Sequence, residues 1–257
     1  MGYRESFEEI CDWRDEQSRV LAGAALVHAI EERIEREADP RKRRMLRYFL
    51  AREYKAQGDS AAAKAVFDQD PVHQIEDWHL EFSRTHNGPE TICAIEEKIR
   101  NESDPMVLRA LNFALGWEYR GVGDYTAYEA VSLRMFDAEP DEPVPLISLA
   151  EHKLLVQKQP EAAMPIIDRA IEVAFRSGIF RRHALATKAR IALDLAQYHV
   201  VEEILRQIMQ LEFGRGNADI GVERDFYDRL PPGSIDADVA RQYDAFCRAK
   251  GKLPAGG

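Results

Sequence analysis

Aromatic and basic side chains recur along one face of two predicted helices. Tyr48, Arg52 and Lys55 are spaced by four and then three residues, which keeps them on the same side of an α-helix. The same positions 65 residues later hold Phe113, Trp117 and Arg120. Arginine binds a carboxylate through two parallel hydrogen bonds, and aromatic rings bury apolar side chains. These rows favour binding of an acidic peptide or a terminal carboxylate. The alternative is that the aromatic residues belong to the core and the cations are solvated helix ends.

A second candidate surface is a run of positive charge at the start of the first of these helices. It contains Arg41, Lys42, Arg43, Arg44 and Arg47. Positive charge in the first turns opposes the helix dipole, so the fold alone does not favour it there. The run predicts either a docking patch for an acidic partner or a solvated edge, because charge runs usually face water.

The residues that could support catalysis are poorly placed for it. His73 and His79 are six residues apart, which does not put them on one helical face, and the sequence has no HExxH motif. Gly121-Val122-Gly123 lies at a predicted helix end, without the preceding strand that a dinucleotide site requires. We therefore expect a protein that is not an enzyme and that binds no metal and no cofactor.

The overall charge restricts the choice of partner. The chain has 257 residues, a net charge of -10 and a pI of about 5.3, which argues against nucleic acid because phosphate binding needs a basic face. The three widely spaced cysteines, Cys11, Cys93 and Cys247, indicate reduced thiols. There is no run of 18 apolar residues, and the first residues are acidic rather than typical of a secretory signal. We expect a cytoplasmic protein that does not bind membranes.

An internal duplication organises the chain. Residues 10–66 align without a gap on residues 75–131, with 25 identities in 57 positions. Prolines at 40, 71, 105 and 140 divide this sequence at spacings of 31, 34 and 35 residues, and each follows an acidic residue. An acidic N-cap followed by proline starts a helix, and the same proline stops the preceding one. Each copy is therefore predicted to be two helical hairpins of about 33 residues.

Turn residues and apolar spacing extend this pattern to the rest of the chain. The predicted helices are 6–19, 21–37, 41–57 with its second copy, 61–68, 74–85, 90–103, 125–138, 146–157, 161–175, 181–195, 199–213, 222–230 and 234–250. We predict an all-α chain in which residues 1–214 form an α-solenoid of about six stacked hairpins. Residues 215–257 are predicted to form C-terminal capping helices and a loose tail.

The hairpins resemble the tetratricopeptide repeat. The best match is Leu115-Gly116, Tyr119, Gly123-Asp124-Tyr125 and Pro140, and the resemblance covers about residues 8 to 213. It implies a right-handed superhelix whose first helices line a concave groove that binds peptides, protein tails or helices. In that register the candidate groove residues are Tyr48, Arg52, Lys55, Phe113, Trp117, Arg120, His152, His183 and Arg190.

Two functions remain open at this point. The first is a scaffold or adaptor that binds a peptide or helical segment of another protein, preferably an acidic one. The second is a regulatory sensor, in which a small ligand or peptide bound within the superhelix controls a partner protein. An unpaired apolar end hairpin would also favour a homodimer.

Overall fold

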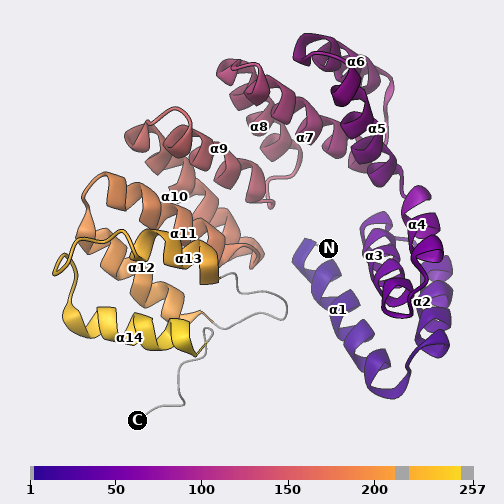
Figure 1. The fold of residues 1–257 in the computed structure, drawn as a ribbon, viewed down its shortest axis with the longest axis horizontal. Coiled ribbons are helices and arrows are strands. Elements are labelled where there is room, and N and C mark those ends of the chain that lie inside the picture. The colour runs from indigo at the N-terminus through magenta and orange to yellow at the C-terminus, as the bar shows by residue number, and fades with distance from the viewer. Residues whose placement is uncertain (1–2, 212–219, 250–257) are drawn as a thin grey trace. The chain divides into compact units, whose positions relative to one another are not determined.

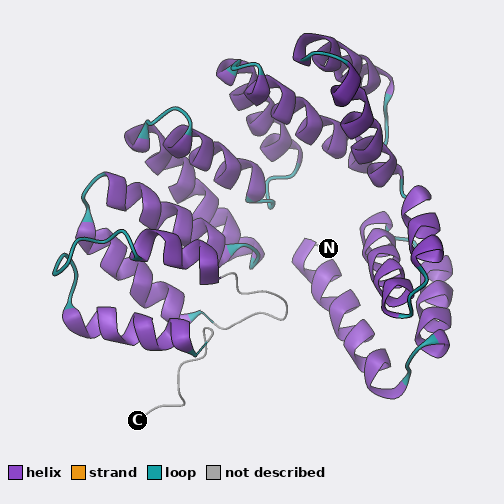
Figure 2. Cartoon of the chain, in the orientation of Figure 1, coloured by secondary structure: helices purple, strands orange, loops and turns teal. Residues whose placement is uncertain are grey.

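The computed structural model describes residues 3–211 and 220–249, and the regular structure in these ranges is entirely α-helical (Figures 1 and 2). The chain divides into two compact units, Met1–Met135 and Phe136–Gly257. The first unit contains both copies of the duplicated sequence. No helix in the described part of the chain has the length and apolar character needed to cross a membrane.

The helices of the two units follow one another as successive hairpins (Figure 1). The first unit holds α1 (Tyr3–Val20), α2 (Ala24–Arg36), α3 (Pro40–Ala56), α4 (Ser60–Asp68), α5 (Pro71–Thr85), α6 (Gly88–Asn101), α7 (Pro105–Gly121) and most of α8 (Tyr125–Ala138). The second unit holds α9 (Val144–Leu155), α10 (Pro160–Ser177), α11 (Arg181–Asp194), α12 (Tyr198–Gln210), α13 (Ile220–Tyr227) and α14 (Ala237–Arg248). We call the odd-numbered helices first helices, because each opens a hairpin. The all-α fold of helical hairpins is confirmed.

Acidic N-caps followed by proline start three of the first helices, as expected. The Asp39 carboxylate accepts a hydrogen bond from the Arg41 amide at 2.8 Å, and Asp104 accepts one from the Met106 amide at the same distance. The Asp70 carboxylate likewise accepts a hydrogen bond from the Val72 amide at the start of α5. Pro140 is the exception to the prediction. It lies in a turn, and α9 begins only at Val144, after Pro143.

In each copy, a glycine follows the helix that opens the second hairpin, which is α3 in the first copy and α7 in the second. Gly58 and Gly123 have φ values of 81° and 79°, in the left-handed region that other residues avoid. In both copies the main-chain amide of the next aspartate donates a hydrogen bond to a tyrosine carbonyl. Asp59 donates to Tyr54 and Asp124 donates to Tyr119, both at 2.9 Å. These turns fix where the next helix starts, so the duplicated sequence produces the same backbone geometry twice.

Each copy of the duplication builds its own apolar core. Ile30, Leu46 and Leu50 are buried in the first copy, together with residues of α1. The equivalent residues Ile95, Leu111 and Leu115 are buried in the second copy, in a separate cluster. The identities between the copies therefore include the apolar residues at the centre of each core.

The second unit continues the hairpin order to its C-terminal helices. Within it, α9 packs on α11, α11 on α13, and α12 on α14. Phe226 of α13 and Tyr243 of α14 are fully buried in the core that they share with α11 and α12. The last two helices therefore add one more hairpin to the stack. The predicted boundary between residues 214 and 215, the helix end at 212–213 and the tail from residue 252 lie outside the described residues.

Candidate functional site

Several polar contacts occur twice in the first unit and are structural. The Tyr54 hydroxyl donates a hydrogen bond to Glu31 at 2.7 Å, and Tyr119 donates to Glu96 at the same distance. Burial and this hydrogen bond raise the pKa of Tyr119 to about 12. The hydrogen bond to Glu31, with a smaller effect of burial, raises the pKa of Tyr54. A contact that both copies retain supports the shared fold rather than a site in one copy.

The tryptophans of the repeated Asp-Trp pair are also part of the framework. Trp13 packs against the first core and Trp78 against the second. A cation lies over each ring, since the Arg33 guanidinium is 5.8 Å from Trp13 and the Lys98 ammonium is 4.3 Å from Trp78. Such cation–π contacts add about 0.5–1 kcal/mol at partly exposed positions.

The predicted aromatic and basic rows of α3 and α7 are exposed to solvent. Tyr48 is 51% exposed and Trp117 is 62% exposed. An arginine lies over each ring. The Arg52 guanidinium is 5.9 Å from the centroid of the Tyr48 ring, and the Arg120 guanidinium is 5.1 Å from that of Trp117. Lys55 is exposed as well. The predicted alternative, that the large ring of Trp117 belongs to the core, is wrong.

Phe113 is the weakest member of these rows. It is half-buried, and the Arg109 guanidinium lies 5.6 Å from its ring. Its position on α7 is next to Ala114, which belongs to the second core. Phe113 therefore contributes only part of its ring to the surface.

Leu80 of α5 is among the exposed apolar residues that sequence reasoning did not single out. It is 54% exposed, while Ile75 and Trp78 of the same helix pack against the core. Three first helices of the unit, α3, α5 and α7, therefore each expose one large apolar side chain, and Val20 at the end of α1 is exposed as well. We call Tyr48, Leu80 and Trp117 with the cations Arg52, Lys55, Arg84 and Arg120 the exposed first-helix face.

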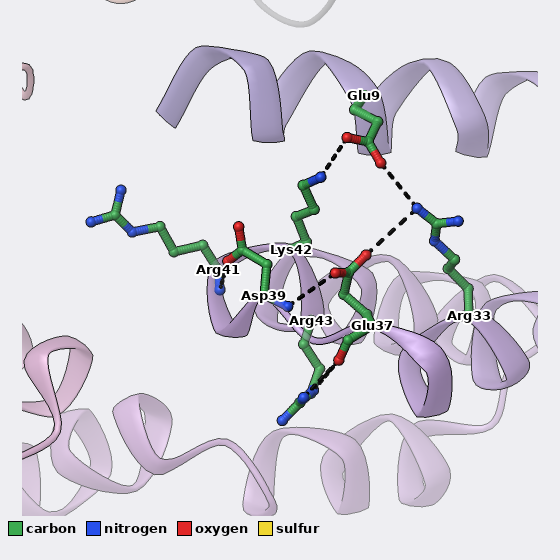
Figure 3. Close-up of polar contacts among 7 residues, drawn as sticks. All are labelled: Glu9, Arg33, Glu37, Asp39, Arg41, Lys42 and Arg43. Carbon is green, nitrogen blue, oxygen red and sulfur yellow. Dashed lines mark hydrogen bonds and ion pairs between the residues drawn. The ribbon is translucent and has the colours of Figure 1, made fainter. Parts of the chain in front are cut away.

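The basic run at the start of α3 is not the exposed patch that its charge predicts. Lys42 is only 7% exposed and donates to Glu9 of α1, and this hydrogen bond raises the pKa of Lys42 (Figure 3). The same Glu9 carboxylate accepts from Arg33 of α2 at 3.0 Å, and Arg33 also lies 3.5 Å from Glu37 (Figure 3). The network ties three helices together, so Lys42 is corrected to a buried ion-pair residue.

The other basic residues of the run have separate roles. Arg43 donates to the main-chain carbonyl of Glu37 at 2.6 Å, which closes the loop before α3 (Figure 3). Arg44 pairs with Asp70 at 3.1 Å and lies 3.6 Å from Glu76 of α5. Arg41 and Arg47 are half-buried. The five residues therefore do not form one continuous positive surface.

In the second unit the predicted residues meet around a carboxylate. Glu151 of α9 accepts hydrogen bonds on one oxygen from His183 at 2.9 Å and Thr187 at 3.0 Å, and Arg190 lies 3.5 Å from that oxygen. Arg190 also donates to Asp225 of α13 at 3.1 Å. His183 and Arg190 thus link three first helices of this unit.

His152, by contrast, is only 2% exposed and does not belong to any surface row, which corrects the prediction. Its neighbour Glu151 occupies the outward position instead. Burial by itself raises the pKa of Glu151, but the hydrogen bonds from His183 and Thr187 and the charge of Arg190 outweigh it. The pKa of Glu151 is consequently lowered. Glu151 is therefore a charged link between helices at neutral pH.

No group of three or more histidine, cysteine or acidic side chains in residues 3–211 and 220–249 is arranged to hold a metal ion. His73 lies over the Phe67 ring at 5.0 Å, and His79 accepts or donates to Glu118 at 2.7 Å, so the two histidines face different neighbours. The three cysteines, Cys11, Cys93 and Cys247, are not in disulfides.

Stacked hairpins and an exposed first-helix face define a helical-repeat protein. No family model matches the chain, and no curated protein matches it. Among solved structures, a match is the crystal structure of PilW, described as a widely conserved type IV pilus biogenesis factor. The match has 17% sequence identity and a TM-score of 0.48, and it covers 87% of this chain and 98% of that chain. We draw no functional conclusion from a similarity of this size.

Proposed function

We propose that this chain is a scaffold of the tetratricopeptide type that binds an acidic segment of a partner protein on the exposed first-helix face. One observation carries the proposal. Besides Val20 at the end of α1, three first helices of one unit each present a large apolar side chain that is more than half exposed: Tyr48, Leu80 and Trp117. Exposed aromatic residues flanked by arginine are typical of the few residues that dominate binding energy at protein interfaces.

The charge of the face supports an acidic partner. Arg52, Lys55, Arg84 and Arg120 are exposed beside the apolar residues, although the chain as a whole has a net charge of -10. Two of the three acidic side chains on α5 are already engaged, since Glu76 contacts Arg44 and Asp77 lies 3.6 Å from His73, while Glu81 is exposed. A partner segment with carboxylates and apolar side chains would satisfy the cations and cover the rings.

A library of fluorescent peptides tests the proposal directly. It should contain acidic sequences with interspersed apolar residues, and the same sequences with Asp and Glu replaced by Asn and Gln. We expect the acidic set to bind and the amide set to bind at least about tenfold more weakly, because each charged hydrogen bond contributes roughly 1.5–3 kcal/mol. Equal affinity for the two sets would contradict the proposal.

Variants of the face complete the test. The triple reversal Arg52→Glu, Lys55→Glu and Arg120→Glu should abolish peptide binding and leave the helix content unchanged, since these side chains are exposed. The matched control reverses three exposed cations elsewhere: Arg100, Lys158 and Arg248. It changes the net charge equally and should leave binding intact. If both triple variants lose binding to the same extent, the effect is long-range charge and not this face.

A further inference from the structure

A surface pocket of about 490 Å³ lies between α1, α2 and the start of α3 in the first unit. Its size is within the range of pockets that hold small molecules. Its wall is formed by Glu9, Trp13, Gln17, Ala29, Glu32, Arg33, Arg36, Glu37, Ala38 and Lys42. The exposed first-helix face does not include any residue of this wall, whereas Trp13 and Arg33 of the wall also make the cation–π contact that recurs in the second copy.

The charges of the wall balance. The wall has three carboxylates and three cations, and Figure 3 shows how Glu9, Arg33, Glu37 and Lys42 among them are connected. The outer pair is the most exposed to solvent: Arg36 lies 3.4 Å from Glu32, and both side chains are well exposed. A ligand that carries both signs can satisfy groups of both kinds without leaving a net charge in the pocket. Trp13 adds an aromatic wall beside these charges.

The second copy has different residues at several of these positions. Gln17 corresponds to Phe82, which packs against Trp78 with ring centroids 5.4 Å apart. Arg36 corresponds to Asn101, so the second copy also lacks this outer cation. An aromatic residue at this position is therefore compatible with the fold, and the first copy has a glutamine there instead. The fold does not require the pocket to be open.

We propose that this pocket binds a small zwitterion of the amino-acid class. The ligand carboxylate would pair with Arg36 and Arg33, its ammonium group with Glu32, and its side chain would lie against Trp13. The site is separate from the exposed first-helix face, and a ligand in it would span α1 and α2, whose side chains form most of the wall. The chain would then be a partner-binding protein that also takes up a small metabolite.

Isothermal titration calorimetry of the full chain tests the ligand class. Each of the twenty standard amino acids is titrated, and the best ligand is compared with its amide and its N-acetyl derivative. We expect at least one amino acid to bind and both derivatives to bind about tenfold more weakly or worse, because each has lost one charged partner. Absence of heat with all twenty amino acids overturns the proposal, as does equal binding of the singly charged derivatives.

Two single substitutions locate the site. Gln17→Phe places the residue of the second copy into the pocket and should abolish binding, with the helix content unchanged. Phe82→Gln, the reverse exchange in the second copy, should leave binding as it is. Binding that survives Gln17→Phe would place the ligand elsewhere and overturn the proposal. The triple reversal on α3 and α7 should not alter amino-acid binding, so this test and the peptide test can fail independently.

Discussion

Some equivalent residues of the two copies make equivalent contacts, and the most informative of these are the tyrosine–glutamate pairs. Tyr54 and Tyr119 both donate to a glutamate on the helix that precedes their own. Ionisation of the phenol would place a second negative charge beside that glutamate and would remove the donor. The hydrogen bond therefore stabilises the fold only while the tyrosine is protonated.

Replacing Tyr119 with phenylalanine should change how stability responds to alkaline pH. The pKa of Tyr119 is about 12 in the fold against 10.0 for an ordinary tyrosine. A raised pKa gives stability that is complete below pH 10 and is lost as the pH rises through about 12. We expect Tyr119→Phe to be less stable at neutral pH and to lose less stability over this interval. Denaturant unfolding at several pH values measures both, and an unchanged alkaline slope would contradict the assignment.

At the residue scale, sequence reasoning placed the exposed aromatic residues better than the charges. Helical spacing put Tyr48 and Trp117 in rows with basic residues, but it left open whether these rings are exposed or belong to the core. Lys42 was read as part of a charged run, although it precedes Leu46 by four residues and therefore lies on the buried face. Leu80 was missed because an apolar residue is normally assigned to the core. The predicted position of the surface row on α9 was wrong by one residue, because Glu151 and not His152 lies there. Periodicity does not resolve a shift of one residue.

At the scale of the helix, the acidic caps are the best-determined feature. Asp104 accepts from the amides of both Met106 and Val107, at 2.8 and 3.4 Å, whereas Asp39 accepts from that of Arg41. The start of α3 was predicted to within one residue, at Arg41 instead of Pro40. Pro140 broke the rule, because the chain turns for a few residues more before α9 begins.

Alanine at either cap should destabilise the first unit by about 1 kcal/mol, the typical cost of losing an N-cap side chain. We expect Asp104→Ala to have at least as large an effect as Asp39→Ala, because its carboxylate accepts from two amides. Chemical denaturation of the two variants gives the comparison. Asp141→Ala, which removes an exposed acidic residue after Pro140 that caps no described helix, is the control. A larger effect of the control than of either cap would show that these caps do not determine the helix starts.

At the scale of the whole molecule, the two units have separate cores. The duplicated copies bury their apolar residues within residues 10–135, and the second unit buries its own. Phe136, near the end of α8, is part of the core of the second unit. The hairpin order was predictable from the duplication and the proline spacing. The division after Met135 was not, because it falls inside a helix with no break in sequence.

A fragment of residues 1–139 should therefore fold without the rest of the chain. It keeps α1 to α8 complete and contains both duplicated cores. We expect far-ultraviolet circular dichroism to show helix content per residue close to that of the full chain, together with a cooperative thermal transition. A second fragment should start at Tyr125, so that Phe136 remains in its helix. A disordered first fragment would mean that its cores depend on the second unit.

The ion pair between Glu9 and Lys42 has a consequence for folding of a duplicated sequence. Because the copies are so alike, α5 offers nearly the same apolar face as α1, and each could dock on the other's partners in a swapped intermediate. In that arrangement Gln74, the equivalent of Glu9, would face Lys42 and leave a buried cation without its carboxylate, while Glu9 would face Val107. The charge of Glu9, placed where the two copies differ, thus helps to distinguish the correct pairing from the exchanged one.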